Sequence, residues 1–251
     1  MRRFFLGGHD LEMTEIARLL TEAGEAFEDL GLAWGACASA YLTSIERSVA
    51  EGETPVLVEL APDLPAELHA HCVEVDHHGD RAGSDQPSSL EQVWRLIGAD
   101  PARWTRWRVL VAANDIGHIP ALRRTGASDE EIRAVRAADR ASQGVTAQDE
   151  ARAAAASRAH RRLGTLVVVE TDLNRSSPII DHLALEMGVP VETTDILVLM
   201  PGEAAFFGAG RIIGRLSDWP GAWWGGDLPE RGYWGAKLRE QDRARLIKAC
   251  A

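Results

Sequence analysis

The amino-acid sequence predicts an α/β protein with a mainly parallel N-terminal sheet flanked by helices, a helical linker and a smaller C-terminal α/β domain. Two observations carry this prediction. Short apolar runs alternate with helical patterns through the first half of the chain, which is typical of a parallel sheet. At Leu163-Gly164 the composition changes, and a new series of strands begins. The expected parts are 1–127, the linker 128–162, and 163–251.

The composition indicates a globular protein with a buried core. The chain has 251 residues, of which 45% are hydrophobic and 26% are charged. Its formal net charge of −11 argues against binding to duplex nucleic acid through broad electrostatics. It permits a small phosphorylated substrate or a short single-stranded oligonucleotide, held in a local basic pocket. The sequence leaves open whether the chain forms a homo-oligomer.

Cysteine usage and hydropathy point to the cytoplasm. Cys37, Cys72 and Cys250 form no CxxC pair, so neither a thiolate zinc site nor a disulfide framework is suggested. The apolar run at the N-terminus is too short for a signal peptide. No segment approaches the roughly 18 apolar residues of a membrane span, so no membrane contact is expected.

Hydrophobic patterning places the elements of the first half. The expected strands are 3–7, 32–36, 55–60 and 72–75, and the expected helices are 11–23, 39–50 and 88–97. Ser88 with Glu91 has the spacing of a capping box, which favours a helix start there. The run 108–113 is also apolar, and its length does not separate a strand from a buried helix.

The linker and the second half follow from the same patterns. Ser128 with Glu131, and Thr146 with Asp149, predict two capped helices separated by Gly144. Arginines 133, 136 and 140 are expected on a solvated helix face, although Arg140 could instead face a cleft. Beyond the linker, the expected strands are 165–170, 195–200 and 204–207, the expected helices are 176–187 and 236–249, and 217–235 shows no periodicity.

The most informative segment is 74–78, Glu-Val-Asp-His-His. It reads as the end of a buried strand that opens into a loop, where open α/β sheets bind their ligands. Side chains alternate along a strand, so His77 and His78 can reach one site only from a turn. Two imidazoles and a carboxylate suit Mn²⁺, Zn²⁺ or Fe²⁺. The alternative is a surface histidine pair with a capping Asp76.

Other candidate strands also end in acids and imidazoles. These residues are His9, Asp10 and Glu12, then Glu59, then Asn114, Asp115 and His118. If the strands are parallel, all four clusters lie on one edge of one sheet. So many carboxylates would repel one another without cations. Two divalent ions bridged by a carboxylate and a water would suit in-line displacement at such an edge.

Each of these residues has a simpler interpretation as well. Asp10 precedes an expected helix and could only cap it. Glu59 could be a solvated strand end, Asp115 an ordinary turn residue, and His9 a satisfied histidine at the edge of the core. These alternatives stay open for each residue taken singly.

The motifs resemble those of the DHH phosphoesterase superfamily, which includes RecJ-type exonucleases, oligoribonucleases, cyclic dinucleotide phosphodiesterases and family II pyrophosphatases. The resemblance covers about residues 1–140. It rests on Val73-Glu74-Val75-Asp76-His77-His78, Pro87-Ser88-Ser89-Leu90, Val56-Leu57-Val58-Glu59-Leu60 and Ala112-Ala113-Asn114-Asp115-Ile116-Gly117-His118-Ile119. The stretch from Gly225-Gly226 to Gly235 is similar to the substrate loop of the DHH-associated C-terminal domain. Glu59 stands where the family has Asp, and the first motif, His9-Asp10-Leu11-Glu12, is shorter.

This resemblance implies a divalent-metal-dependent phosphoesterase acting on a nucleotide, a short oligonucleotide or another small phosphate ester. The implied metal ligands are His9, Asp10, Glu12, Glu59, Asp76, His77 and Asp115, with Mn²⁺ expected and Mg²⁺ or Zn²⁺ as alternatives. Asp76 and His78 would be catalytic, and His78, His118, Arg140, Gly225, Gly226 and Arg231 would bind substrate. The alternatives are a non-catalytic nucleotide-binding protein on a decayed scaffold, and a metal-dependent hydrolase of a non-phosphate substrate.

The aromatic C-terminal segment also has two interpretations. Trp219, Trp223, Trp224, Tyr233 and Trp234 lie within sixteen residues, separated by glycines. Aromatic faces stack on bases, so with nearby arginines they could hold a nucleotide. The alternative, favoured for at least half of the tryptophans, is that they fill the core of a small domain.

Overall fold

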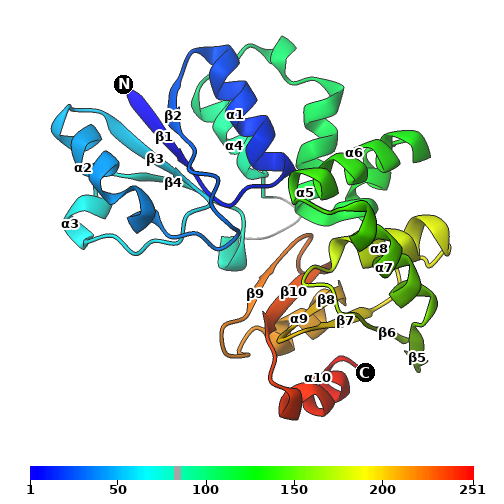
Figure 1. Cartoon of the computed structure of the whole chain (residues 1–251). Coiled ribbons are helices and arrows are strands. Elements are labelled where there is room, and N and C mark those ends of the chain that lie inside the picture. The colour runs from blue at the N-terminus through cyan, green and yellow to red at the C-terminus, as the bar shows by residue number, and fades with distance from the viewer. Residues whose placement is uncertain (82–85) are drawn as a thin grey trace. The chain divides into compact units, whose positions relative to one another are not determined.

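The computed structural model describes residues 1–81 and 86–251, and it divides the chain into two compact units (Figure 1). Unit 1 comprises Met1–His77 and Pro87–Ala112, and unit 2 comprises His78–Gln86 and Ala113–Ala251. Each unit contains one sheet with helices packed on it, so the predicted α/β class is confirmed. The boundary between the units falls between His77 and His78, inside the motif that the sequence singles out.

Unit 1 is built on a four-stranded parallel sheet in the order β2-β1-β3-β4. The strands are β1 (Arg2–Leu6), β2 (Ala26–Glu28), β3 (Thr54–Val58) and β4 (Val73–Val75). The two central strands, β1 and β3, finish in the buried apolar runs 4–6 and 56–58, as expected for parallel strands that are covered on both faces. The register pairs Phe5 with Leu57, and both are buried. The predicted parallel sheet is therefore confirmed.

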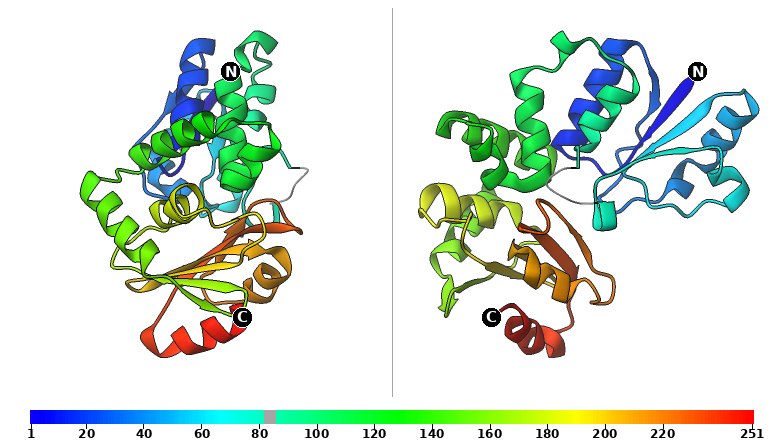
Figure 2. Two further views of the ribbon diagram at one scale, coloured as in Figure 1. Left: turned by 90° about the vertical axis from the view of Figure 1, so that its right-hand side faces the viewer. Right: turned by 180° about the vertical axis from the view of Figure 1, so that it is seen from behind.

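Helices cover both faces of this sheet (Figure 2). The elements are α1 (Leu11–Ala23), η1 (Ala38–Tyr41), α2 (Leu42–Ala50), α3 (Ala66–His69), α4 (Ser89–Leu96) and η3 (Pro101–Arg103). On one face, Phe5 and Leu57 pack against Tyr41 and Ile45. Helices α1 and α4 lie together on the other side. Gly24 ends α1 in the left-handed conformation that glycine adopts without a steric penalty.

The helical part of unit 2 contains the predicted hairpin. It comprises η2 (Gly79–Arg81), the C-terminal part of α5 (Arg106–Arg124), α6 (Asp129–Ser142), α7 (Ala147–Arg158), α8 (Ser177–Asp181) and the π-helical turn η4 (His182–Glu186). Both predicted capping boxes are present, one at the start of α6 and one at the start of α7. They satisfy backbone N–H groups that have no partner inside the helix.

The sheet of unit 2 is mixed and has the strand order β5-β6-β7-β8-β10-β9. The strands are β5 (Arg161–Leu163), β6 (Leu166–Glu170), β7 (Ile196–Met200), β8 (Glu203–Ala209), β9 (Trp223–Gly225) and β10 (Arg231–Lys237), and only β6 and β7 pair in parallel. Helices α9 (Gly210–Leu216) and α10 (Arg243–Cys250) cover one face (Figure 2). Helix α9 directly follows β8, and the turn η5 (Glu240–Asp242) precedes α10. Helices α7 and α8 lie on the other.

Tryptophans of the aromatic segment contribute to the core of unit 2, in agreement with the second of the two interpretations given above. Trp234 is 1% exposed, and its indole N–H donates to the carbonyl of Leu216. Trp219 meets it edge to face at a centroid distance of 6.1 Å, and Trp224 packs against the same cluster.

Several expected elements differ from the structure. The strand after α1 is β2, and 32–36 contributes only an isolated bridge from Leu32. The run 108–113 is helical and forms part of α5. It ends in Ala112 and Ala113, and alanine has the highest helix propensity. The unpatterned stretch 217–235 supplies β9 and most of β10, whose aromatic residues suit strands. The last helix begins at Arg243, because the residues before it finish β10 and the turn that follows.

Among residues 1–81 and 86–251, no helix combines the length and the apolarity that a membrane span requires.

Candidate metal centre

Three side chains meet at the carboxyl-terminal edge of the unit 1 sheet. Glu59 follows β3, His77 follows β4, and Glu12 lies in the first turn of α1. The Nε2 atom of His77 lies 3.4 Å from Oε1 of Glu59 and 3.8 Å from Oε2 of Glu12. All three side chains are at most 7% exposed. The predicted convergence of strand-end acids and imidazoles therefore holds for these residues.

The chemistry of these three groups fits a divalent cation. Both separations exceed the length of a hydrogen bond. They resemble the distance between two ligands of one ion when each bond is about 2.1 Å long. Carboxylate and imidazole together suit Mn²⁺ or Zn²⁺.

The backbone orients these ligands. Oε1 of Glu12 accepts a hydrogen bond of 3.0 Å from the N–H of Leu90, so the start of α4 fixes this carboxylate. Glu59 has a φ of 51°, in the left-handed region that a non-glycine residue seldom adopts, and its N–H donates to the carbonyl of Val75. Such strain persists where the surrounding structure imposes it, and it concentrates at functional sites.

Gly7 makes this arrangement possible, because a β-carbon there would lie 2.5 Å from the carbonyl oxygen of Glu59. Replacing Gly7 with alanine is expected to shift the end of β3 and to weaken Mn²⁺ binding about 10-fold, as measured by calorimetry. Gly214→Ala is the control, since nothing lies within 4 Å of the β-carbon it would add. Equal Mn²⁺ affinity in Gly7→Ala and wild type would contradict the prediction.

The remaining predicted ligands of unit 1 lie in the same motifs. Oδ1 of Asp10 accepts a hydrogen bond of 2.8 Å from the N–H of Met13, so Asp10 does cap α1. His9 is exposed, and its backbone N–H donates to the carbonyl of Leu32. Asp76 is half-buried, and its carbonyl accepts from the side-chain amide of Gln92 at 3.1 Å. Whether these three residues hold a metal stays a prediction.

A second pair of candidate ligands lies in unit 2. His78 and Asp115 bring one ligand atom each to within 4.8 Å of the other, and both side chains are half-buried. His78 also directs its ring edge toward Tyr233 at a centroid distance of 6.4 Å. Asp115 lies within α5, so the expectation that all four acidic clusters follow strands of one sheet is wrong for this one. His77 and His78 are consecutive in the chain, so one peptide bond joins the two groups.

His118 lies at a break in α5. Gly117 and His118 have non-helical backbone angles, and His118 has a φ of 50° and a ψ of −142°. Pro120 follows two residues later and cannot donate the hydrogen bond that a regular helix would need. Burial, with a smaller contribution from the charge of Arg136, lowers the pKa of His118 to about 4. The imidazole of His118 is therefore neutral at ordinary pH.

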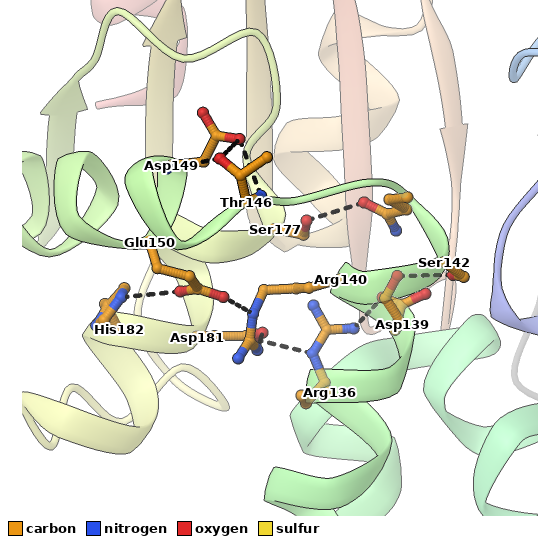
Figure 3. Close-up of polar contacts among 11 residues, drawn as sticks. Arg136, Asp139, Arg140, Ser142, Thr146, Asp149, Glu150, Ser177, Asp181 and His182 are labelled. Carbon is orange, nitrogen blue, oxygen red and sulfur yellow. Dashed lines mark hydrogen bonds and ion pairs between the residues drawn. The ribbon is translucent and has the colours of Figure 1, made fainter.

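The other predicted substrate-binding residues belong to unit 2. Arg140 forms ion pairs with Glu150 and Asp181, so it is part of a buried network (Figure 3). Arg231 donates to the carbonyls of Val191 and Thr194. A β-carbon on Gly225 would lie 2.5 Å from the hydroxyl of Tyr233, and Gly226 has a φ of 99°. Substrate binding by these residues stays a prediction.

The residue that the sequence interpretation missed is Arg136, which is buried and not on a solvated face. The helical spacing of Arg136 relative to the apolar residues of α6 could have identified it as a buried residue. Ile132, Val135, Arg136 and Asp139 are the buried residues of α6, and their spacing marks the inward face of a helix.

Comparison with known proteins shows the fold. No family model and no curated protein matches the sequence. A solved DHH domain, described as a member of a family of ribosomal proteins, is 14% identical, with a TM-score of 0.51, covering 99% of this chain and 85% of that one. The pGpG-specific phosphodiesterase PggH from Vibrio cholerae is 14% identical (TM-score 0.39, covering 99% and 97%). RecJ with Mn²⁺ from Thermus thermophilus is 12% identical (TM-score 0.46, covering 99% and 51%). The chain has the fold of a DHH-domain protein.

Proposed function

We propose that this chain is a divalent-metal-dependent phosphoesterase that hydrolyses a nucleotide, a short oligonucleotide or another small phosphate ester. The observation that carries the proposal is the buried group of Glu12, Glu59 and His77 at the sheet edge of unit 1. The DHH fold and the order of the motifs along the chain support it.

Glu12, Glu59 and His77 would hold the ion, which we expect to be Mn²⁺. His9, Asp10, Asp76 and Asp115 are the further ligands that we propose. A divalent ion held there would lower the pKa of a bound water and stabilise developing negative charge on phosphoryl oxygens.

The protein's own groups would then position the substrate. His78, next in the chain to a ligand, would donate a hydrogen bond to the scissile phosphate. Asp76 would orient an imidazole or the attacking water. The side-chain amide of Gln92 donates to the carbonyl of Asp76 and to that of Pro87, so it holds the backbone at each of these two residues.

The test combines Mn²⁺ binding with hydrolysis. Calorimetry on the metal-stripped protein should show Mn²⁺ binding that falls at least 10-fold in Glu59→Gln, which removes the charge and keeps the shape of the side chain. The same preparation is assayed with Mn²⁺ on bis-p-nitrophenyl phosphate, short RNA and cyclic dinucleotides. Failure to bind Mn²⁺ would overturn the proposal. Binding without hydrolysis of any of these substrates would favour a decayed, non-catalytic site.

A further inference from the structure

A small pocket in unit 2 is lined by one histidine, His118, whose protonation is controlled by its neighbours. The pocket has a volume of about 40 Å³, and its lining includes His118, Phe207, Tyr233, Ile180 and Val191. The ring of His118 meets those of Phe207 and Tyr233 edge to face, at centroid distances of 5.5 and 5.7 Å. This volume admits one functional group or the edge of a ring, since a single water needs about 10–15 Å³ on the same measure.

Arg136 is a neighbour of His118 and belongs to a buried polar network with Asp139 and Asp181 (Figure 3). Its Nε atom donates to Asp181 at 2.8 Å, and Nη1 donates to Asn114 and Asp139 at 2.8 Å each. Arg136 is 1% exposed, and the two carboxylates balance its charge. This guanidinium therefore has a fixed position from which to act on a neighbour.

Nη1 of Arg136 also lies 3.2 Å from Nδ1 of His118. Nη1 has two hydrogens, and Asn114 and Asp139 accept them at shorter distances, so Nδ1 of His118 is a third, more distant acceptor that shares them. A proton on Nδ1 would instead point at a guanidinium nitrogen that has no free lone pair, so this contact favours an Nδ1 atom without a proton. The ring proton of the neutral imidazole is then on Nε2. Protonating Nδ1 would place two donors and two positive charges against each other, and the low pKa of His118 agrees with this.

The two arginines that line the pocket are already engaged. Arg124 forms an ion pair with Asp227, and Arg231 donates to two backbone carbonyls of the segment 191–194. The lining also contains Asp227, whose carboxylate is the partner of Arg124, together with aromatic and aliphatic side chains. The group that this surface suits is therefore an uncharged hydrogen-bond acceptor with an apolar or planar body, and not a free phosphate.

We infer that Arg136 is a positioning residue that holds His118 as a fixed Nε2–H donor, and that this donor binds a carbonyl oxygen or ring nitrogen of a nucleobase in the pocket. The inference rests on the proposed function for the nucleotide nature of the ligand. It adds that this protein recognises the base through an uncharged donor.

The tautomer is tested first, by long-range ¹H–¹⁵N NMR of the ¹⁵N-histidine-labelled full chain at pH 7. The His118 signals are assigned from the spectrum of His118→Gln. We expect the Nε2–H form in wild type, and a mixture of tautomers in Arg136→Met, which removes both the charge and the donors. An Nδ1–H form or an imidazolium in wild type would overturn the inference. So would an unchanged tautomer in a folded Arg136→Met protein.

Base recognition is tested by titrating guanosine 5′-monophosphate and ribose 5-phosphate in EDTA, so that metal plays no part. We expect the nucleotide to bind at least 10-fold more tightly than the sugar phosphate. His118→Ala should lower nucleotide affinity about 10-fold, and His118→Gln, which keeps a neutral N–H donor, should stay within about threefold of wild type. Both variants keep a β-carbon, so the backbone strain at this position is matched.

The two proposals fail separately. Equal affinity for the two probes, or an unchanged affinity in His118→Ala, would overturn the base pocket even if Mn²⁺-dependent hydrolysis is found. Base-dependent binding that falls in His118→Ala and is kept in His118→Gln would support the pocket even if no phosphate ester is hydrolysed.

Discussion

Replacing His77 with alanine is expected to lower Mn²⁺-dependent hydrolysis of bis-p-nitrophenyl phosphate about 1000-fold. The imidazole is 3% exposed, and its Nε2 atom lies close to carboxylate oxygens of both Glu12 and Glu59, so the substitution removes a buried candidate ligand. The expected loss corresponds to about 4 kcal/mol of transition-state stabilisation. Such a loss is reasonable because removing a ligand would both weaken the binding of the ion and displace the water that the ion would activate.

The measurement needs a histidine control from the same part of the chain. His71 is exposed and precedes β4, so His71→Ala should hydrolyse the substrate at the wild-type rate. Metal content is measured in parallel, because His77→Ala should also lose Mn²⁺. A His77→Ala protein that hydrolyses the substrate at the wild-type rate would remove the proposed centre from the mechanism.

The part of this centre in unit 1 was predictable because each ligand follows a local rule. The strands β1 and β3 finish in the apolar runs 4–6 and 56–58, so their ends, and hence Glu59, were located from sequence alone. Parallel pairing then fixed which edge they share. Asp10 was also predictable as a helix cap, since an acid before an apolar helical stripe is favoured there.

The parts that were not predictable depend on long-range packing. The run that contains Leu110 and Val111 is apolar in either conformation, and only its continuation into α5 decides for a helix. The strand β2 has three residues and none of them is fully buried, so it gave little pattern to detect. Arg136 was assigned to solvent because arginine is seldom buried unless it is paired. Its partners Asp181 and Asn114 are 45 and 22 residues away.

Arg136 is also the residue whose loss should cost the most stability. Replacing it with methionine keeps much of the volume but leaves the buried carboxylate of Asp139 without the cation that pairs with it, while Asp181 keeps its ion pair with Arg140. Burial already raises the pKa of Asp139, which shows how poorly this environment supports a carboxylate. Removing one partner of a buried ion pair costs about 3–5 kcal/mol, so Arg136→Met should unfold at markedly lower urea concentration.

Arg133 provides the matched control for this experiment, since it lies on the same helix one residue past Ile132 and is exposed. Arg133→Met removes the same charge and adds the same side chain, so its urea midpoint should stay close to that of wild type. If both variants unfold together with wild type, the network in Figure 3 does not stabilise unit 2. If only the urea midpoint of Arg136→Met falls, part of the loss should be recovered by Asp139→Asn in the same chain, because the second change removes the carboxylate that Arg136 no longer balances.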